Sequence, residues 1–351
     1  MAAPWTDKIL DSHCHLFELK RFQYPWPTPD LCIYRDHQPE DLWDAMADTG
    51  VKDVVFVQCL NDSPEEAKWV MSLAKQHPRI KGIVAGLDPS HPQFESRLVA
   101  LKEEVPLLVG FRHILDIDPR QDYLEREELA AGVNLLHKYN MTFDLLLRPP
   151  LLEGAGVLAS RVSGTRMVVD HLAKPYIAEG KLDPWREHIA AVARYPNIYC
   201  KLSSMATEAD LEKWKDLRPY VEASGVGEGK GGCVAIYEDV DAGVCGVVGR
   251  NDFGGGVGGS EGGDVSKGVG RSVGRVAWRK FHLTIFQYTH MLKVFGPDRL
   301  MFGSDWPVCR LAANTDYGRV FSALKELLQH LPDHQQKKIF CTNARNFYNI
   351  Q

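Results

Sequence analysis

The feature that most constrains the fold is an alternation of eight short β-rich segments with helix-like stretches. Most of these segments are continuous apolar runs, such as Val54-Val55-Phe56-Val57, as is typical of parallel strands buried on both faces. The expected strands span residues 9–16, 51–58, 80–87, 107–115, 142–148, 165–172, 197–203 and 298–305. Eight alternating units predict an α/β protein built as a (β/α)8 TIM barrel, which needs roughly 250 residues. The 351 residues therefore fit a single domain with insertions.

Signals for helix ends lie between the expected strands. Ser63-Pro64-Glu65-Glu66 predicts a capping box with proline at the first helical position, and Asp183-Pro184 repeats the order of cap and proline. Gly50 and Asn140 stand where helices are expected to end before the second and fifth strands. These signals support helices between the strands independently of the apolar pattern.

Composition narrows the class of protein. Hydrophobic residues make up 44% of the chain, enough for one large core, while a net charge of −5 and a pI near 6.2 exclude the basic footprint of nucleic-acid or acidic-membrane binding. No apolar stretch approaches the roughly 20 residues of a membrane span, and the first residues lack the pattern of a signal peptide. The eight cysteines form no CxxC pair. We expect a cytoplasmic protein that acts on a small molecule, with its oligomeric state left open.

One stretch does not match a barrel. Residues 225–275 hold 18 of the 30 glycines, a composition that cannot bury enough apolar surface to offset its conformational entropy. We expect residues 225–287 to be a disordered insertion between strands seven and eight, interrupting one domain that spans 1–351. It is either a flexible insertion or translated sequence from a retained intron. The second origin is favoured because residues 217–222 and 290–296 would join into one amphipathic helix without it.

A polar run ends the first expected strand. Side chains alternate along a strand, so His13 and His15 point to the same face. If the sheet closes into a barrel, Asp305 at the end of the last strand faces them. Two imidazoles and a carboxylate can share a metal or a substrate oxygen, whereas the histidine spacing alone favours a pair of histidines with a structural role.

Five motifs in order, each at an expected strand end, carry a family resemblance. They are DSHCHL at 11–16, GFRHIL at 110–115, DHLAKP at 170–175, KLSS at 201–204 and LMFGSDWPV at 300–308. Together they resemble the amidohydrolase superfamily, and within it the sugar-lactonase-like L-fuconolactonase branch. The closing segment, residues 338–348, is also similar to that branch. The resemblance covers the whole chain except the glycine-rich stretch.

The resemblance implies catalytic roles for three side chains at the carboxyl ends of strands, where enzymes of this fold place their chemistry. Asp305 matches the general base of the superfamily and would take a proton from the water that attacks an acyl carbon. His171 and His113 are further catalytic candidates. The carbonyl would be polarised and the developing oxyanion held by His13, His15, His171 and Arg112. His113 could instead cap a loop.

Four other residues are expected to bind the substrate. Arg112 and Lys201 offer cationic groups near the strand ends, although Lys201 could instead pair with a buried carboxylate. Tyr24 and Trp26 belong to an aromatic and proline-rich loop after strand one, which either covers the site or packs on the barrel rim.

Two interpretations of the metal content remain. Two-metal members of the superfamily use a lysine or glutamate on strand four and a histidine on strand five. Here strand four offers Arg112 and His113, and strand five, residues 142–148, has no histidine. The sequence therefore predicts either one divalent, zinc-like metal bound by His13, His15 and Asp305, with His171 nearby, or a site that is independent of metal.

The leading functional hypothesis is a hydrolase that opens a lactone, meaning a sugar-acid lactone or a similar cyclic ester. A metal-dependent decarboxylase of an aromatic carboxylate is the first alternative, although the DHLAKP motif is lactonase-like. A catalytically silent barrel kept for binding is the second, and the full set of titratable residues at the strand ends speaks against it.

Overall fold

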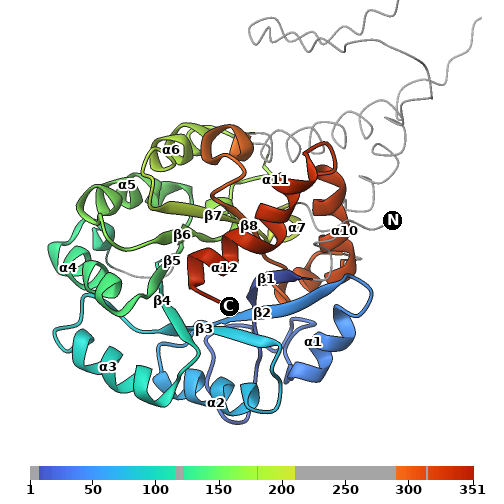
Figure 1. Cartoon of the computed structure of the whole chain (residues 1–351), viewed down its shortest axis with the longest axis horizontal. Helices are drawn as coiled ribbons and strands as arrows, with labels where there is room; N and C mark the ends of the chain where they lie inside the picture. Colours follow the sequence, from blue (N-terminus) through green and yellow to red (C-terminus); the bar gives the residue numbers. More distant parts are fainter. Residues whose placement is uncertain (1–7, 116–119, 121, 180, 210–289, 314) are drawn as a thin grey trace, which may run out of the picture.

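The computed structural model describes residues 8–115, 120, 122–179, 181–209, 290–313 and 315–351. Eight parallel strands pair in sequence order as one sheet, and helices surround them (Figure 1). The strands are β1 (Ile9–Cys14), β2 (Val51–Val57), β3 (Ile80–Gly86), β4 (Leu108–Ile114), β5 (Thr142–Leu146), β6 (Met167–Val169), β7 (Ile198–Leu202) and β8 (Leu300–Phe302). The α/β barrel expected from the alternation of apolar segments is confirmed.

The ends of the sheet meet where β8 lies beside β1. The backbone N–H of Asp305 donates to the carbonyl of His13 at 2.9 Å, and that of His15 donates to the carbonyl of Trp306 at 2.7 Å. The Ser12 hydroxyl adds a bond of 2.6 Å to the carbonyl of Phe302. The loop after β8 is thus joined to β1, which places the last strand end against the first.

Helices cover the outside of the sheet and one of its ends. They are α1 (Pro39–Ala45), α2 (Pro64–Ala74), α3 (Phe94–Glu104), α4 (Glu127–Leu135), α5 (Leu152–Arg161), α6 (Trp185–Val192), α7 (Met205–Glu208), α10 (Tyr317–Leu327), α11 (Asp333–Lys337) and α12 (Asn343–Tyr348). In Figure 1, α12 lies across the barrel end that faces the viewer. Its Phe347 and Tyr348 pack with Leu10, Val55 and other inward-facing residues of the strands. The amino-terminal end of the barrel is therefore closed by apolar packing, and the carboxyl end remains for chemistry.

Several strands are shorter than the sequence predicts, and the sixth and eighth are shortened at both ends. The sixth, expected over 165–172, is only Met167–Val169, and the eighth, expected over 298–305, is only Leu300–Phe302. Beyond these points His171 and Asp305 adopt positive φ angles of 55°, which an extended strand excludes. The apolar pattern therefore located each strand correctly. The strands end early because the backbone at the polar end does not stay extended.

The predicted capping box at α2 is only half correct. Ser63 is the N-cap residue and accepts a bond from the N–H of Glu65 at 3.3 Å, and Pro64 opens the helix as expected. Glu66 does not reach back to the cap. Its carboxylate is 1% exposed and accepts from the N–H of Cys59 at 3.2 Å. The loop after β2 offers Glu66 a buried donor, which replaces the reciprocal bond of a capping box.

The other predicted helix signals have mixed outcomes. Gly50 directly precedes β2 with φ of 82°, and Asn140 ends a helical turn in the left-handed region, both as expected. Helix α6 begins one residue later than predicted, with Pro184 as its N-cap. The Asp183 carboxylate bonds the Arg186 guanidinium at 2.9 Å rather than a backbone N–H, because the charged donor on the first turn competes for it.

The predicted insertion at 225–287 lies outside the described residues, as does most of the helix expected before strand eight. Residues 290–295 are helical, and Met291 and Phe295 are buried against the barrel. No helix among the described residues combines the length and the apolar character that crossing a membrane requires.

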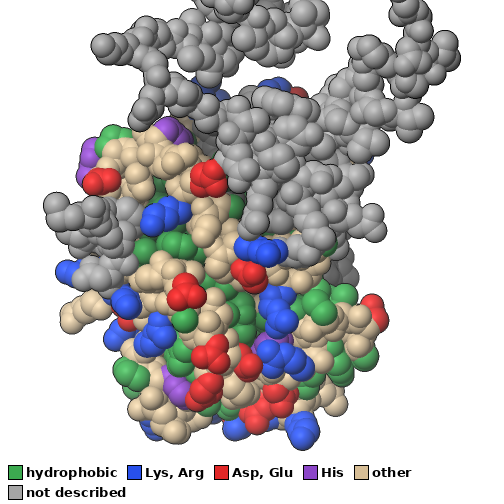
Figure 2. Space-filling view, turned by 90° about the vertical axis from the view of Figure 1, so that its right-hand side faces the viewer, with side chains coloured by type: hydrophobic (Ala, Val, Ile, Leu, Met, Phe, Trp, Pro, Cys, Tyr) green, Lys and Arg blue, Asp and Glu red, His purple; other side chains and the backbone are tan. Residues whose placement is uncertain are grey.

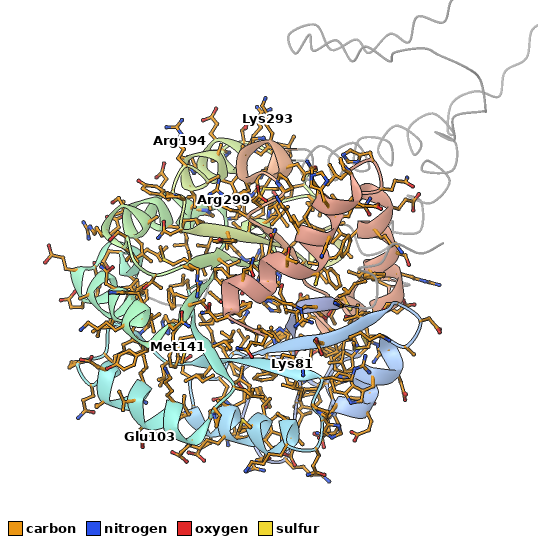
Figure 3. The ribbon with its side chains drawn as sticks, viewed as in Figure 1. Lys81, Glu103, Met141, Arg194, Lys293 and Arg299 are labelled. Atoms are coloured by element: carbon orange, nitrogen blue, oxygen red, sulfur yellow. The ribbon has the colours of Figure 1, made fainter. Side chains whose placement is uncertain are left out.

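The described surface is polar and of mixed charge. Figure 2 shows lysine and arginine side chains interspersed with aspartate and glutamate over one face. Glu103, Arg194 and Lys293 are exposed and point away from the barrel (Figure 3). Arg299 instead turns back along the chain, where its guanidinium donates to the carbonyls of Tyr195 and Ile198 at 2.9 and 3.0 Å. This arginine ties the start of β8 to the start of β7.

We predict that two glycine-to-alanine substitutions in helices have opposite effects on stability. In α4, a Cβ at Gly132 would lie 1.9 Å from the carbonyl oxygen of Pro89, so Gly132→Ala forces the β3–α3 loop away and costs about 1–3 kcal/mol. In α5, a Cβ at Gly156 meets nothing within 4 Å, so Gly156→Ala gains up to about 1 kcal/mol of helix propensity. Urea unfolding measures both. Equal effects of the two variants would contradict the close approach of α4 to Pro89.

Candidate active site

A β-bulge in β1 aims the two histidines into the barrel. Between Asp11 and Cys14 the strand advances three residues while β2 advances two, from Val54 to Phe56. Strict alternation would put His13 on the face opposite Leu10, which packs in the barrel interior. The extra residue reverses the alternation, so His13 and His15 join the interior while Cys14 faces the helices. That the two histidines share a face, as their spacing predicts, is confirmed.

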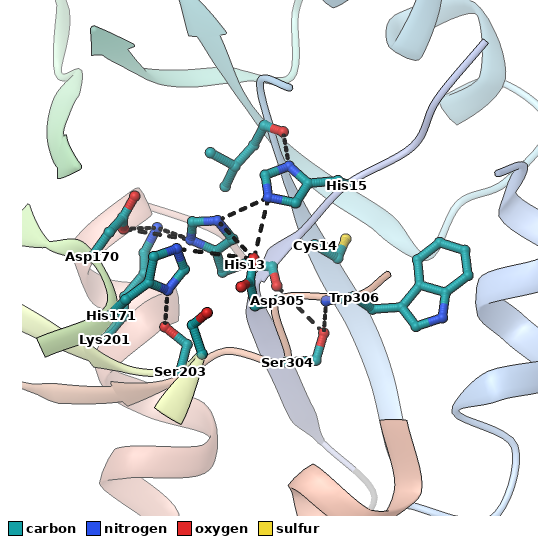
Figure 4. A network of polar contacts seen from close by, with 12 residues as sticks. His13, Cys14, His15, Asp170, His171, Lys201, Ser203, Ser304, Asp305 and Trp306 are labelled. Atoms are coloured by element: carbon teal, nitrogen blue, oxygen red, sulfur yellow. Dashed lines mark hydrogen bonds and ion pairs between the residues drawn. The ribbon is translucent and has the colours of Figure 1, made fainter. Parts of the chain in front are cut away.

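Four side chains from three strand ends converge on one point (Figure 4). Nε2 of His15 lies 3.3 Å from Nε2 of His13 and 3.3 Å from Oδ1 of Asp305. The same carboxylate oxygen is 3.7 Å from Nε2 of His13 and 3.9 Å from Nε2 of His171. All four residues are at most 5% exposed. The structure therefore brings together four of the residues that the sequence singled out.

Left-handed backbone places two of the four. Four consecutive residues, His171 to Lys174, have positive φ angles, and so does Asp305. Such conformations cost about 1–2 kcal/mol for a residue with a Cβ and persist where the surrounding structure imposes them. Here they turn the chain sharply after β6 and β8, so that His171 and Asp305 face the barrel axis.

Hydrogen bonds on the outer side of two imidazoles orient the rings. Nδ1 of His15 lies 2.8 Å from the carbonyl oxygen of Val57, which only accepts, so this nitrogen carries the proton and Nε2 presents a lone pair. Nδ1 of His171 lies 2.7 Å from the hydroxyl of Ser203, a partner that suits either tautomer. Both rings are thus fixed with Nε2 toward the centre.

The site is built to hold neutral imidazoles around an ionised carboxylate. Burial lowers the pKa of His171 to about 4 and that of His13 well below its usual value, although Asp305 and Asp170 act in the opposite direction. Burial opposes ionisation of Asp305, but His171, His15 and His13 outweigh it and hold its pKa below the ordinary range. Near neutral pH, Asp305 is a proton acceptor, and the imidazoles of His13 and His171 carry no charge.

A second layer of charged side chains lies behind His13. Arg112 donates to Asp170 at 3.0 Å and to the carbonyl of Gln58 at 2.5 Å. The Lys201 ammonium lies 3.0 Å from Asp170 and 2.5 Å from Asp144. Lys201 is 0% exposed and Arg112 2%. The structure therefore places both cations in buried ion pairs, which for Lys201 is the alternative that the sequence left open, and the role of both in substrate binding stays a prediction.

His113 is not part of the converging group. It follows Arg112 on β4 and so points to the opposite face of the sheet, where its ring stacks on Tyr123 at 4.9 Å between centroids. Its nitrogens lie 3.3 Å from Arg120 and 3.4 Å from Asp62. These contacts assign it to a network between loops at the barrel rim, in line with the loop-capping alternative.

The aromatic loop after β1 packs beside the site. The Tyr24 ring meets Phe17 edge-on at 5.2 Å, and Phe17 in turn lies 6.2 Å from the His15 ring. Trp26 is half-buried in the same loop. Tyr24 is thus separated from His15 by one aromatic ring, and the role of Tyr24 and Trp26 in substrate binding stays a prediction.

Three buried carboxylates matter to the site but were not singled out as site residues from the sequence. Asp170 precedes His171 inside the DHLAKP motif, and Asp144 interrupts the apolar run of strand five. A charged residue within an expected buried strand is a usable signal, since it needs a partner there. Asp11 accepts from the N–H groups of His13 and Ser304 at 3.0 and 2.9 Å. Its interior position followed from barrel closure, which the sequence pattern alone does not locate.

The converging side chains fit a divalent metal ion. In the described part of the chain, His13, His171 and Asp305 have potential ligand atoms within 4.8 Å of one another. The 3.3 Å spacings around Nε2 of His15 match the roughly 3.3–3.6 Å between ligands about 2.0–2.2 Å from a tetrahedral zinc. The donor set of imidazole nitrogens and one carboxylate is also typical of zinc. The group within 4.8 Å contains His171 where the predicted set has His15, whose Nε2 lies 3.3 Å from both His13 and Asp305.

The fold and these motifs agree with a family comparison. A model of the amidohydrolase family matches residues 10–225 and 275–350. The chain belongs to the amidohydrolase family, whose members are hydrolytic enzymes. The resemblance predicted from the motifs is thereby confirmed. The unmatched residues, 226–274, lie within the glycine-rich stretch, whose interpretation as an insertion stays a prediction.

Named relatives narrow the class further. An L-fucono-1,5-lactonase of Burkholderia ambifaria is 26% identical over 349 residues, which cover 97% of this chain and 95% of that protein. A second L-fucono-1,5-lactonase, of Burkholderia multivorans, is 27% identical over 318 residues, covering 88% and 84%. The crystal structure of an amidohydrolase from Burkholderia multivorans with bound zinc superposes with a TM-score of 0.72 at 24% identity, over 98% of this chain and all of that one. That structure shares the fold.

A buried glutamate, Glu66, is connected to His15 through Cys59. Sγ of Cys59 is 3.6 Å from Nδ1 of His15, and the Cys59 N–H donates to Glu66. Burial raises the pKa of Glu66 to about 8, although the bond from Cys59 acts in the opposite direction. Glu66 is therefore protonated in the folded protein at neutral pH.

We predict that Glu66→Gln becomes more stabilising, relative to the wild type, as pH rises from about 4.5 to 8. The folded wild type holds a proton on Glu66 that the unfolded chain releases above its ordinary pKa of 4.5, so its stability falls over this window by about 1.4 kcal/mol per pH unit. Glutamine cannot ionise. Urea unfolding at several pH values measures the difference, with Glu65→Gln on the exposed side of α2 as control. Parallel curves for wild type and Glu66→Gln would refute the shift.

Proposed function

We propose that this protein is a hydrolase that opens a lactone, a sugar-acid lactone or a similar cyclic ester, with Asp305 as general base. The observation that carries the proposal is the convergence of three imidazoles on one carboxylate at the carboxyl end of the barrel. Two L-fucono-1,5-lactonases among the relatives support a cyclic ester as substrate. The decarboxylase and the silent binding barrel remain as outcomes of the tests below.

The residues of the chain account for each proton in such a reaction. A water between the substrate and Asp305 gives a proton to Oδ1 as its oxygen attacks the lactone carbonyl carbon. The imidazoles of His13, His15 and His171 surround the centre where the tetrahedral oxyanion forms. When the bond from the acyl carbon to the ring oxygen breaks, Asp305 returns the proton to that oxygen. The product is an open-chain hydroxy acid, and Asp305 is again ionised.

A divalent cation fits the same centre. His13, His15, His171 and Asp305 would hold it, and when bound it would polarise the substrate carbonyl as a Lewis acid. The bond from His15 Nδ1 to Val57 leaves the lone pair of Nε2 available for this purpose. One centre of this size holds one ion, which supports a single metal and not a binuclear pair.

We expect a panel of sugar 1,4- and 1,5-lactones to include a substrate, detected as acid release with a pH indicator. The active-site residues supply acyl transfer to water, which amides with poor leaving groups and carboxylates do not match. Carbon dioxide release from an aromatic acid without lactone turnover would establish the decarboxylase alternative. Binding of sugar lactones without either reaction would establish the silent barrel.

Asp305→Asn should lower kcat by about 100-fold or more, because the amide cannot accept the proton of the attacking water. The fold should persist, since asparagine keeps the shape of the side chain. Circular dichroism and thermal unfolding check the fold. Asp44→Asn, on the exposed face of α1, is the matched control and should retain wild-type turnover. An Asp305→Asn enzyme with most of its activity would remove this residue from the mechanism.

Elemental analysis of protein purified without chelator should find no more than one divalent ion per chain. A double variant, His13→Gln with His171→Gln, should lose that ion because two of its four ligands are gone. Two equivalents per chain would contradict the single centre. Full activity in protein that holds no metal would establish the metal-independent form of the reaction.

A further inference from the structure

The Nδ1 atom of His13 faces a donor and an acceptor at almost the same distance. The Lys201 ammonium is 3.2 Å away and Oδ1 of Asp170 is 3.4 Å away. An ammonium group only donates hydrogen bonds, and an ionised carboxylate only accepts them. Either tautomer of His13 therefore finds a partner at Nδ1.

The other ring nitrogen of His13, Nε2, is favoured with a proton when no cation is bound and must offer a lone pair when one is bound. Nε2 of His15, 3.3 Å away, presents a lone pair because Nδ1 of His15 donates to the carbonyl of Val57. Without a cation, two lone pairs at this distance repel, and Oδ1 of Asp305 at 3.7 Å is a further acceptor, so His13 is favoured with a proton on Nε2. Nη1 of Arg112, 3.4 Å from the same atom, only donates and favours the other tautomer, but it already donates to Asp170 at the shorter distance of 3.0 Å. With a cation at the centre, both Nε2 atoms must offer lone pairs, and the proton of His13 belongs on Nδ1.

We propose that Lys201 and Asp170 form a tautomer switch for His13. In the cation-free protein, Nδ1 accepts from Lys201 and Nε2–H points into the centre. When a cation binds, the proton leaves Nε2 and one is placed on Nδ1, where Asp170 accepts it. The imidazole stays neutral throughout, and Lys201 and Asp170 act as positioning residues.

The surrounding contacts hold both partners in place. Lys201 is fixed by Asp144 at 2.5 Å and Asp170 at 3.0 Å, and Asp144 accepts from the Tyr348 hydroxyl of α12 at 2.8 Å. Arg112, whose Nη1 lies 3.4 Å from Nε2 of His13, donates to the other oxygen of Asp170 at 3.0 Å. All five of these side chains are at most 2% exposed. Because these side chains are held in place, the position of the proton on His13 changes and the positions of its partners do not.

The inference rests on the proposed function in one respect, that His13 faces the reacting centre. The tautomer can be read without any substrate. A protein that opens no lactone but shows the switch would refute the function and leave the switch intact, whereas an active lactonase with one fixed tautomer would do the reverse.

The test is ¹H–¹⁵N NMR of the full chain labelled in its histidines, with and without Zn²⁺. Two-bond couplings distinguish Nδ1–H from Nε2–H, and a His13→Gln variant assigns the signals of His13. We expect Nε2–H in the metal-free wild type and Nδ1–H after one equivalent of Zn²⁺. His15 is the internal control and should remain Nδ1–H throughout, since the Val57 carbonyl can only accept.

The decisive variant is Lys201→Met combined with Asp144→Asn. Lys201→Met alone leaves two buried carboxylates against one cation and can prevent folding, whereas the pair of changes removes one charge of each sign and keeps an acceptor for Tyr348. We expect His13 in this variant to be Nδ1–H even without Zn²⁺, because only Asp170 remains to pair with Nδ1. A metal-free variant that retains Nε2–H, or a wild type whose His13 signals do not change with Zn²⁺, would overturn the proposal.

Discussion

The attachment of the loop after β8 to β1 is the constraint on which the whole site depends, and a buried carboxylate secures it. Oδ1 of Asp11 accepts from the N–H groups of His13 and Ser304, which are far apart along the chain, while Oδ2 accepts from the Tyr317 hydroxyl at 2.9 Å. Asp11 and Ser304 are 293 positions apart in sequence. Three donors offset much of the cost of burying this group, although burial still raises its pKa. Because Asp11 bonds both to β1 and to the loop after β8, it holds Asp305 in a fixed position relative to His13 and His15.

The buried carboxylates near this closure differ in whether a cation lies beside them, and this difference suits the proposed reaction. Arg112 and Lys201 pair with Asp170 and Asp144, which form a closed network behind His13. Among the described residues, the ion-pair partners of Asp305 are the imidazoles of His13, His15 and His171, and burial lowers the pKa of His13 and His171. Asp305 therefore differs from Asp170 and Asp144 in having no permanent cation beside it. Both a proton from water and a divalent ion would satisfy that charge.

Backbone departures from regular geometry are concentrated at the same end of the barrel. The bulge in β1 turns His13 inward, and positive φ angles turn His171 and Asp305 toward the axis. Each departure costs free energy locally and is imposed by the closed sheet and its hydrogen bonds. The opposite end, packed by α12 and the inward-facing apolar residues, supplies the stability that tolerates these conformations.

The sequence by itself determined the order of the eight strands, the closed barrel and the family, because apolar runs and motifs at strand ends are local signals. It also identified His13, His15, His171 and Asp305, since polar groups at the ends of buried strands need a purpose. Only the tertiary structure decided which way the other side chains point and which residues they contact. Strand alternation puts His113 opposite Arg112, and Lys201 forms a buried salt bridge with Asp144. Glu66 turned inward rather than capping α2 because the loop after β2 offers it a buried N–H. Lys201 and Asp144 are 57 positions apart, and Glu66 and Cys59, although only 7 apart, meet because of the path of the loop after β2, so no local pattern records these partners.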